Sequence, residues 1–267
     1  MSADAAVLGR VTQRRVNRSE WTKLRSVRST RWSLLVALLL LIGIGILACV
    51  IFEARWNQLS PEDKFHFHAL RQTLGGVNFA QLAFGVLGVL TITAEYSTGM
   101  IRSSMSAVPK RLPVLWGKLL VFGAVTFAIC LPSVFVVFFI GHAILTGHHL
   151  NIALSHPGVL RALIGAALYL TVIGLLGLGL GAIVRNTAGG IALLVGLMFL
   201  LPPILDLLPS SVSSSIDPYL PASAGGAVWT INPDPNTLHP WVGLAVFAGY
   251  AAVSIVIAAV LMVRRDT

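Results

Sequence analysis

Six long segments without a charged residue most constrain how this chain can fold. They span residues 32–52, 75–94, 119–140, 162–184, 187–205 and 241–263. Each is close to the roughly 20 residues that a helix needs to cross about 30 Å of hydrocarbon. Because backbone groups inside lipid must bond within their own segment, each is predicted to be helical. The predicted fold class is an all-α polytopic membrane protein with six transmembrane helices.

The composition agrees with a membrane protein. Only 11% of the 267 residues are charged, whereas soluble domains carry about 25%. The net charge is +9. The basic residues lie beside apolar segments and not on a separate polar domain, so we expect no nucleic-acid partner. The two cysteines, Cys49 and Cys130, sit inside apolar runs and are predicted to be buried thiols. No spacing of cysteines or histidines matches a known ligand motif, and we predict no metal site.

The basic residues predict the orientation in the membrane. The polar segments between the apolar ones should lie alternately on the two sides of the membrane. The segments on the side of the N-terminus hold fifteen Lys and Arg together, and those on the other side hold four. Loops that stay in the cytoplasm carry the excess of Lys and Arg, so both termini are predicted to be cytoplasmic (N-in/C-in). The expected organisation is a cytoplasmic lead (1–31), a six-span domain (32–263) and a cytoplasmic tail (264–267).

The N-terminal lead is predicted to contain an interfacial amphipathic helix. Its stretch "RRVNRSEWTKLRSVRSTRW" places Trp21, Leu24 and Val27 three residues apart among basic residues. Such a helix lies on the membrane surface, where its cations attract anionic lipid. Trp21 and Leu24 are the predicted anchors in the membrane lipids. The alternative is a disordered basic lead whose only role is to set topology.

The segment 206–240 is predicted to lie outside and to re-enter the outer leaflet. It holds three acids and no Lys or Arg, yet "SSIDPYLPASAGGAVWTI" is too apolar for a plain hydrated loop and too short to span the membrane. We expect short helices that dip into the lipid. A packed surface loop is the alternative interpretation.

The sequence carries no catalytic signature, so we do not expect an enzyme. It lacks the phosphate-binding motif G-x-x-x-x-G-K-[ST] and the H-E-x-x-H and G-x-S-x-G motifs. No ionisable Asp, Glu, Lys or Arg lies inside the six apolar segments, which disfavours a proton-driven carrier. Asn78, Gln81 and Tyr169 could line a path or only bond between helices. The scarcity of polar groups favours an apolar or amphipathic cargo.

The segment 95–118 between the second and third apolar segments is charged and holds Gly and Pro. Glu95 ends the second span, and residues 100–108 could form a short helix closed by Pro109. Four apolar residues would share one face of that helix: Met100, Ile101, Met105 and Val108. A short amphipathic helix exposed to the cytoplasm favours a partner groove. The alternative is a loop that carries topological charges.

Several motifs resemble one family of transport proteins. The segment holds a pattern formed by Glu95, Gly99, Ile101, Arg102, Pro109, Arg111, Gly117 and Lys118. This pattern resembles the cytoplasmic loop of ABC-2 type permeases, the membrane subunits of bacterial ABC exporters. The lead "SEWTKLRSVRSTRW", "GLGLGAIVRNTAGGIAL" and "YLPASAGGAV" are also similar to that family, so the resemblance covers nearly the whole chain. Met100 replaces the Thr that is common after the Gly, and it keeps the apolar face.

The resemblance implies a function and a set of partners. The loop would be a coupling helix that docks on a separate ABC ATPase through Met100, Ile101, Met105 and Val108. The charges that would orient it are Glu95, Arg102, Arg111 and Lys118. Two ATPase copies and a second permease, identical or homologous, would complete an exporter in a prokaryotic plasma membrane. This chain would hold no cofactor, because ATP and Mg would bind the ATPase.

Two other functional classes remain as alternatives. One is an autonomous secondary carrier or channel, and the other is a non-transporting membrane scaffold or sensor subunit. Transport by the purified chain without any ATPase would favour the carrier.

Overall fold

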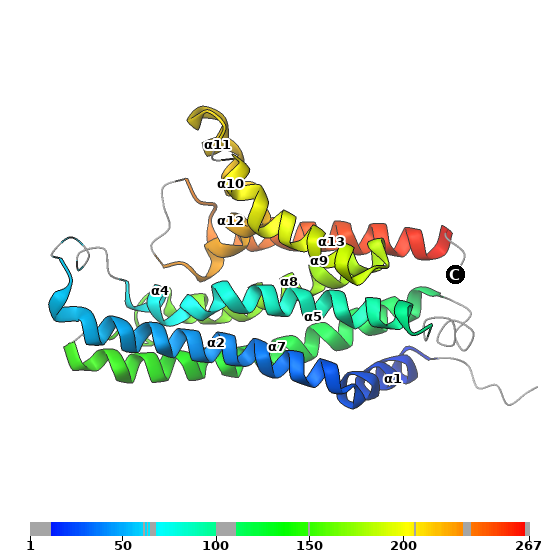
Figure 1. Cartoon of the computed structure of the whole chain (residues 1–267), viewed down its shortest axis with the longest axis horizontal. Coiled ribbons are helices and arrows are strands. Elements are labelled where there is room, and N and C mark those ends of the chain that lie inside the picture. The colour runs from blue at the N-terminus through cyan, green and yellow to red at the C-terminus, as the bar shows by residue number, and fades with distance from the viewer. Residues whose placement is uncertain are drawn as a thin grey trace, which may run out of the picture.

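The computed structural model describes residues 12–60, 62, 64, 68–99, 111–148, 150–205, 207–231 and 236–264. Within these ranges all regular structure is helical (Figure 1). The N-terminal half contains α1 (Gln13–Ser26), α2 (Arg28–Arg55), η2 (Trp56–Gln58), α4 (Ala69–Thr73), η3 (Leu74–Gly76), α5 (Val77–Ser97), α7 (Arg111–Leu145) and η4 (Thr146–His148). The C-terminal half contains α8 (Val159–Val184), α9 (Thr187–Val195), η5 (Gly196–Leu200), α10 (Leu201–Leu205), α11 (Ser210–Ile216), η6 (Asp217–Tyr219), α12 (Pro221–Gly226), η7 (Ala227–Trp229) and α13 (Pro240–Arg264).

Six helical stretches of the described chain are long and apolar enough to cross a membrane, as the sequence predicts. They are Arg28–Gln58, Ala69–Ser97, Leu112–Leu145, Val159–Val184, Thr187–Leu205 and Pro240–Arg264. Several extend beyond the uncharged segments. The helix α5 continues to Ser97 and α7 already begins at Arg111, so the connection between them is shorter than the predicted 95–118 segment. These extensions take Glu95 and Lys118 into helices.

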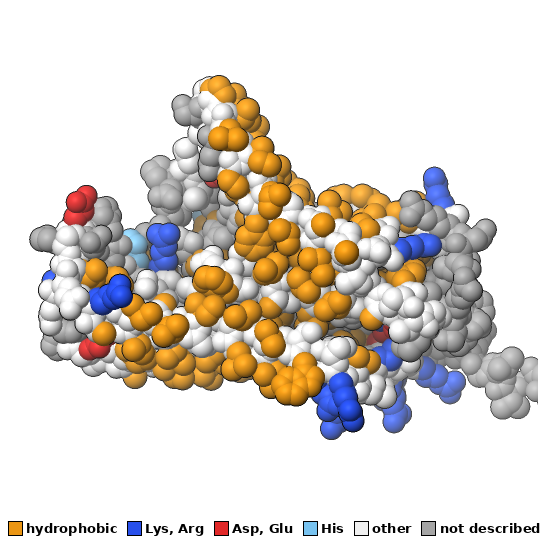
Figure 2. Space-filling view, viewed as in Figure 1, with side chains coloured by type: hydrophobic (Ala, Val, Ile, Leu, Met, Phe, Trp, Pro, Cys, Tyr) orange, Lys and Arg blue, Asp and Glu red, His pale blue; other side chains and the backbone are white. Residues whose placement is uncertain are grey.

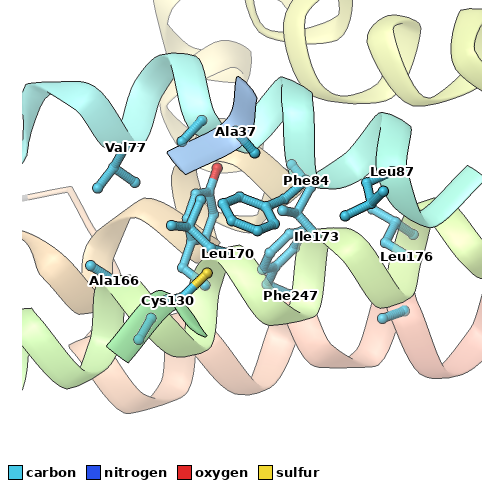
Figure 3. Close-up of a cluster of buried hydrophobic side chains, with 14 of the residues drawn as sticks. Ala37, Val77, Phe84, Leu87, Cys130, Ala166, Leu170, Ile173, Leu176 and Phe247 are labelled. Atoms are coloured by element: carbon cyan, nitrogen blue, oxygen red, sulfur yellow. The ribbon is translucent and has the colours of Figure 1, made fainter. Parts of the chain in front are cut away.

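The helix α8 forms the centre of the bundle. It packs most extensively against α5 and also contacts α7, α9 and α13, and most of its residues are buried. Figure 3 shows Phe84 of α5 beside Leu170 and Ile173 of α8, with Phe247 of α13 nearby, and all four belong to the buried core. Surrounding one apolar helix with others places most of the exposed apolar side chains on the outer helices.

Glycine permits the closest contact in the bundle. A Cβ atom on Gly88 of α5 would lie 1.9 Å from the carbonyl oxygen of Gly174 on α8. A Cβ atom on Gly181 of α8 would lie 2.8 Å from Cγ2 of Ile92 and 3.1 Å from the carbonyl oxygen of Val89 on α5. Small residues let two membrane helices approach until their backbones touch, which compensates for the weak hydrophobic drive between helices in lipid.

The helix α9 packs on α5 and α8, and the stretch after it, from η5 to α11, forms an arm that leaves the bundle, as Figure 1 shows. The helix hydrogen-bond pattern widens to a π-helix in η5, directly before Pro202 and Pro203 in α10. Proline lacks the backbone N–H of a normal helix, and a π-bulge is a usual way to absorb that loss. Leu200, Ile204 and Leu207 are exposed on this arm.

The predicted outer segment 206–240 contains short helices. The helix α12 packs against α13, and η7 packs against both α8 and α13. Pro221, Ala224 and Val228 are buried in these contacts. The segment therefore folds back onto the bundle at the end away from α1 (Figure 1).

The two ends of the described chain lie at the same end of the bundle. Figure 1 shows α1 and the end of α13 together there. Figure 2 shows hydrophobic side chains over the middle of the bundle and the arm, with Lys and Arg gathered around the α1 end. The exposed hydrophobic residues include Trp32, Leu39, Val253 and Val256. Six apolar helices with this surface indicate a multi-pass membrane protein.

Candidate functional site

The helix α1 lies against the beginning of α7. Val16 is buried in this contact, and a Cβ atom on Gly117 would lie 2.8 Å from Cγ1 of Val16. The side-chain amide of Gln13 donates to the carbonyl oxygen of Pro113 at 3.1 Å. The absence of a side chain at Gly117 therefore allows α1 to pack against α7.

Four charged side chains meet where α1, α5 and α7 come together, and we call Glu20, Lys23, Glu95 and Lys118 the charge cluster. The Lys118 ammonium donates to Oε2 of Glu20 at 2.7 Å and to Oε1 of Glu95 at 2.9 Å. The Lys23 ammonium donates to Oε1 of Glu20 at 2.7 Å and to Oε1 of Glu95 at 3.0 Å. Each lysine thus bridges the same two carboxylates.

Three members of the charge cluster are withdrawn from water, whereas the side chain of the fourth, Lys23, is 26% exposed. Glu20 is 3% exposed, Glu95 4% and Lys118 3%. Burial of Lys23 lowers its pKa, but the hydrogen bond from its ammonium to Glu20 and the negative charges of Glu95 and Glu20 outweigh this, and its pKa is raised. Lys23 therefore stays protonated at neutral pH. Two positive and two negative charges balance, which is the condition under which buried charges are tolerated.

The charge cluster closes the base of the connection between α5 and α7. Glu95 lies near the end of α5, and Lys118 lies two turns into α7. Their ion pair holds the two helices together on either side of the connection, while Glu20 and Lys23 attach α1 to both. Breaking a buried pair by removing one partner costs about 3–5 kcal/mol, so displacing one of the three helices at this point would strain the other two.

A second set of contacts ties further helices together at the same end. Arg185 ends α8 in a left-handed conformation with φ 57°. Its guanidinium lies 5.3 Å from the ring centre of Tyr96 and donates to the carbonyl oxygen of Leu261 at 3.4 Å. The Thr187 hydroxyl donates to the Thr93 hydroxyl at 2.9 Å. These bonds connect α5 with α9 and α13.

The predicted coupling residues are only partly within the described chain. Glu95 and Lys118 are brought together, and Arg111 begins α7. The remaining predicted residues of this segment, Met100, Ile101, Arg102, Met105 and Val108, lie outside the described residues. Trp21 is half exposed, whereas Leu24 packs against the core.

Sequence reasoning missed Glu20 and Lys23. Glu20 is the one acid between Arg10 and Arg31, a stretch otherwise rich in Lys and Arg. It precedes Lys23 by three residues, the spacing at which two side chains meet on one helix face. A single acid in a basic stretch, three residues before a lysine, could have predicted a buried ion pair.

The three predicted pathway residues separate into two environments. Asn78 is exposed at the beginning of α5, whereas Gln81 and Tyr169 are buried. The Tyr169 hydroxyl donates to the side-chain oxygen of Gln81, and the Gln81 amide donates to the backbone oxygen of Asn78 at 2.9 Å. The Tyr169 ring lies 5.2 Å from that of Phe247. Gln81 and Tyr169 therefore form a closed polar contact between α5 and α8.

The fold and this site define a helical multi-pass membrane protein with a buried charge cluster at one end. No protein-family model matches the sequence, and no curated protein matches it.

Proposed function

We propose that this chain is the membrane subunit of an ATP-driven exporter of the ABC-2 type, moved by a separate ATPase through the connection between α5 and α7. The observation that carries the proposal is the charge cluster at the base of this connection. A force on residues 100–110 would be transmitted through Glu95 and Lys118 to α5 and α7, and through Glu20 to α1.

The resemblance of the sequence motifs supports the same function. Glu95, Gly117 and Lys118 belong to the motif that resembles the coupling loop of ABC-2 type permeases. In the structure Gly117 admits α1 against α7, and the other two residues form the ion pair. Each of these three residues therefore has a physical role at the place where a coupling loop would join the bundle.

The assembly that we propose has two permeases and two ATPases. Its cargo is apolar or amphipathic, because uncharged side chains dominate the six apolar helices. The arm from η5 to α11 exposes Leu200, Ile204 and Leu207 away from the bundle, which supports a second permease subunit beside this one. ATP and Mg would bind the ATPases.

The orientation that we propose places α1 and the connection between α5 and α7 in the cytoplasm of a prokaryote, beneath its plasma membrane. Lys and Arg gather at this end, and such an excess is retained on the cytoplasmic side. An ATPase would then have access to residues 100–110. The short helices α11 and α12 would face the outside.

Co-purification with the ATPase tests the proposal. The double variant Ile101→Asp, Met105→Asp should lose an ATPase that co-purifies with the unchanged chain in mild detergent, because charge replaces the apolar face. The matched control carries Ser211→Asp and Ser214→Asp on α11 and should retain it. Membrane insertion of both variants is checked by extraction. Retention of the ATPase by the first variant, or transport by the purified chain alone, would overturn the proposal.

A further inference from the structure

A cavity of about 860 Å³ opens at the end of the bundle away from the charge cluster. Its walls come from α4, the beginning of α5, the segment 150–156 and the region from η6 to η7. Asn78 in this wall and Glu95 in the charge cluster lie on the same helix, 17 residues and therefore about 26 Å apart. A cavity of this size is in the range of small-molecule binding sites.

Three hydrogen bonds hold the walls of the cavity in place. Arg161 of α8 donates to the backbone oxygen of Thr230 at 2.9 Å. Nδ1 of His142 donates to the backbone oxygen of Ile152 at 2.8 Å, and the Ser223 hydroxyl donates to Oδ1 of Asp217 at 3.0 Å. The cavity is therefore built by specific contacts and is not a gap between loose segments.

The wall combines one positive side chain with apolar surface. Arg71 lines the cavity, and Asn78 adds an amide. The acid in the wall, Asp217, already accepts the bond from Ser223, and Arg161 lies directly behind Thr230. Because the Asp217 carboxylate is already bonded, Arg71 is the arginine of the described wall that can meet a ligand, which favours a negatively charged ligand group.

The remaining wall is apolar and aromatic. Leu70, Ile152, Trp229 and Ile231 line it. The indole N–H of Trp229 is buried and has no acceptor among the described residues, so the ring faces the cavity with its apolar surface and not with this donor. An indole usually finds an acceptor when it is buried. Behind Trp229 stands Tyr169, with ring centres 6.5 Å apart.

We propose that this cavity binds an amphipathic anion, with its acidic group at Arg71 and its apolar body against Trp229 and Ile231. The contact between Tyr169 and Gln81 closes the core behind the cavity, so the ligand enters from the end that holds α12. Binding requires only this chain and does not depend on an ATPase. The inference therefore stands or fails separately from the proposed coupling function.

Titration with short amphiphiles on the full chain tests the proposal. The probes are hexyl phosphate, inorganic phosphate and hexyltrimethylammonium, added to protein in non-ionic detergent and followed by calorimetry. Saturable binding of hexyl phosphate alone is expected. Equal binding of inorganic phosphate would overturn the apolar part of the proposal, and equal or tighter binding of the cation would overturn the anionic part.

Two pairs of variants locate the binding. A Cβ atom on Gly226, which lines the cavity, meets nothing within 4 Å, so Gly226→Phe should fill the space without a clash and abolish binding. Gly249 on α13 is equally open and does not line the cavity, so Gly249→Phe is the matched control. Arg71→Gln should weaken binding about tenfold, as expected for a charged hydrogen bond, and Arg55→Gln should not. Full binding by Gly226→Phe would overturn the proposal.

Discussion

A Cβ atom on Gly177 of α8 would lie 2.1 Å from the carbonyl oxygen of Gly85 on α5, so the two backbones touch. Gly177→Ala should therefore force α5 and α8 apart and lower the free energy of unfolding by about 1–3 kcal/mol, the usual cost of overpacking. The midpoint of thermal aggregation in detergent measures this. A Cβ atom on Gly43 of α2 meets nothing within 4 Å, and Gly43→Ala should leave the midpoint unchanged or raise it. Equal midpoints for the two variants would contradict the close contact.

Lys118→Met should detach α1 from the bundle. It leaves Glu20 and Glu95 with Lys23 as the one remaining cation of the charge cluster, and removing one partner of a buried ion pair costs about 3–5 kcal/mol. Trypsin should then cleave within α1 faster, at Arg14, Arg18 or Arg25, which are exposed basic residues.

Two further variants accompany this measurement. Arg264→Met removes an exposed cation at the end of α13 and should not change the cleavage rate. Adding Glu95→Gln to Lys118→Met restores one positive and one negative charge, Lys23 and Glu20, and should recover part of the lost stability. Native protection of α1 in the Lys118→Met variant would show that the charge cluster does not hold it.

Tyr169→Phe should destabilise the centre of the bundle. The variant keeps the ring contacts with Phe247 and Trp229 but leaves the buried side-chain oxygen of Gln81 without its donor. An unsatisfied buried group costs about 1–3 kcal/mol, which thermal unfolding in detergent can detect. Tyr250→Phe removes a hydroxyl that donates to the Tyr219 backbone at an exposed position and should change little. A larger loss for Tyr250→Phe would be the contrary result.

Single cysteines test the proposed orientation. Ser214 on α11 and Thr98 after α5 are both exposed, at opposite ends of the bundle. Ser214→Cys should react with a membrane-impermeant maleimide on intact cells, and Thr98→Cys only after lysis. The native Cys49 and Cys130 are buried, so they should add little background. Labelling of Ser214→Cys only after lysis would reverse the topology.

The six membrane helices could be predicted because their signal is local. An uncharged run of about 20 residues leaves few options in lipid. The ends of the helices were harder to predict, because a helix can continue past the apolar run where its polar residues find partners. Lys118 marked a boundary in the sequence, but in the fold it lies inside α7, since Glu20 and Glu95 neutralise it.

The composition of the charge cluster could not be predicted in full, because its members are far apart in the sequence. Glu20 and Lys118 are separated by 98 positions. The docking of α1 on α7 decides that they meet, and this depends on the shape of the surface around Gly117 and Val16. The pathway residues show the same difficulty. Asn78 and Gln81 are neighbours on one helix, yet one lines the cavity and the other is buried.

The charge cluster also sets an order for biogenesis. The ribosome releases Glu20 and Glu95 before it has made Lys118. Until the third span has left the translocon, the nascent chain carries both acids of the charge cluster but only one of its two lysines, Lys23. The N-terminal third of the protein should therefore reach its final arrangement only after that span is inserted, and chains truncated before it should be substrates for membrane quality control.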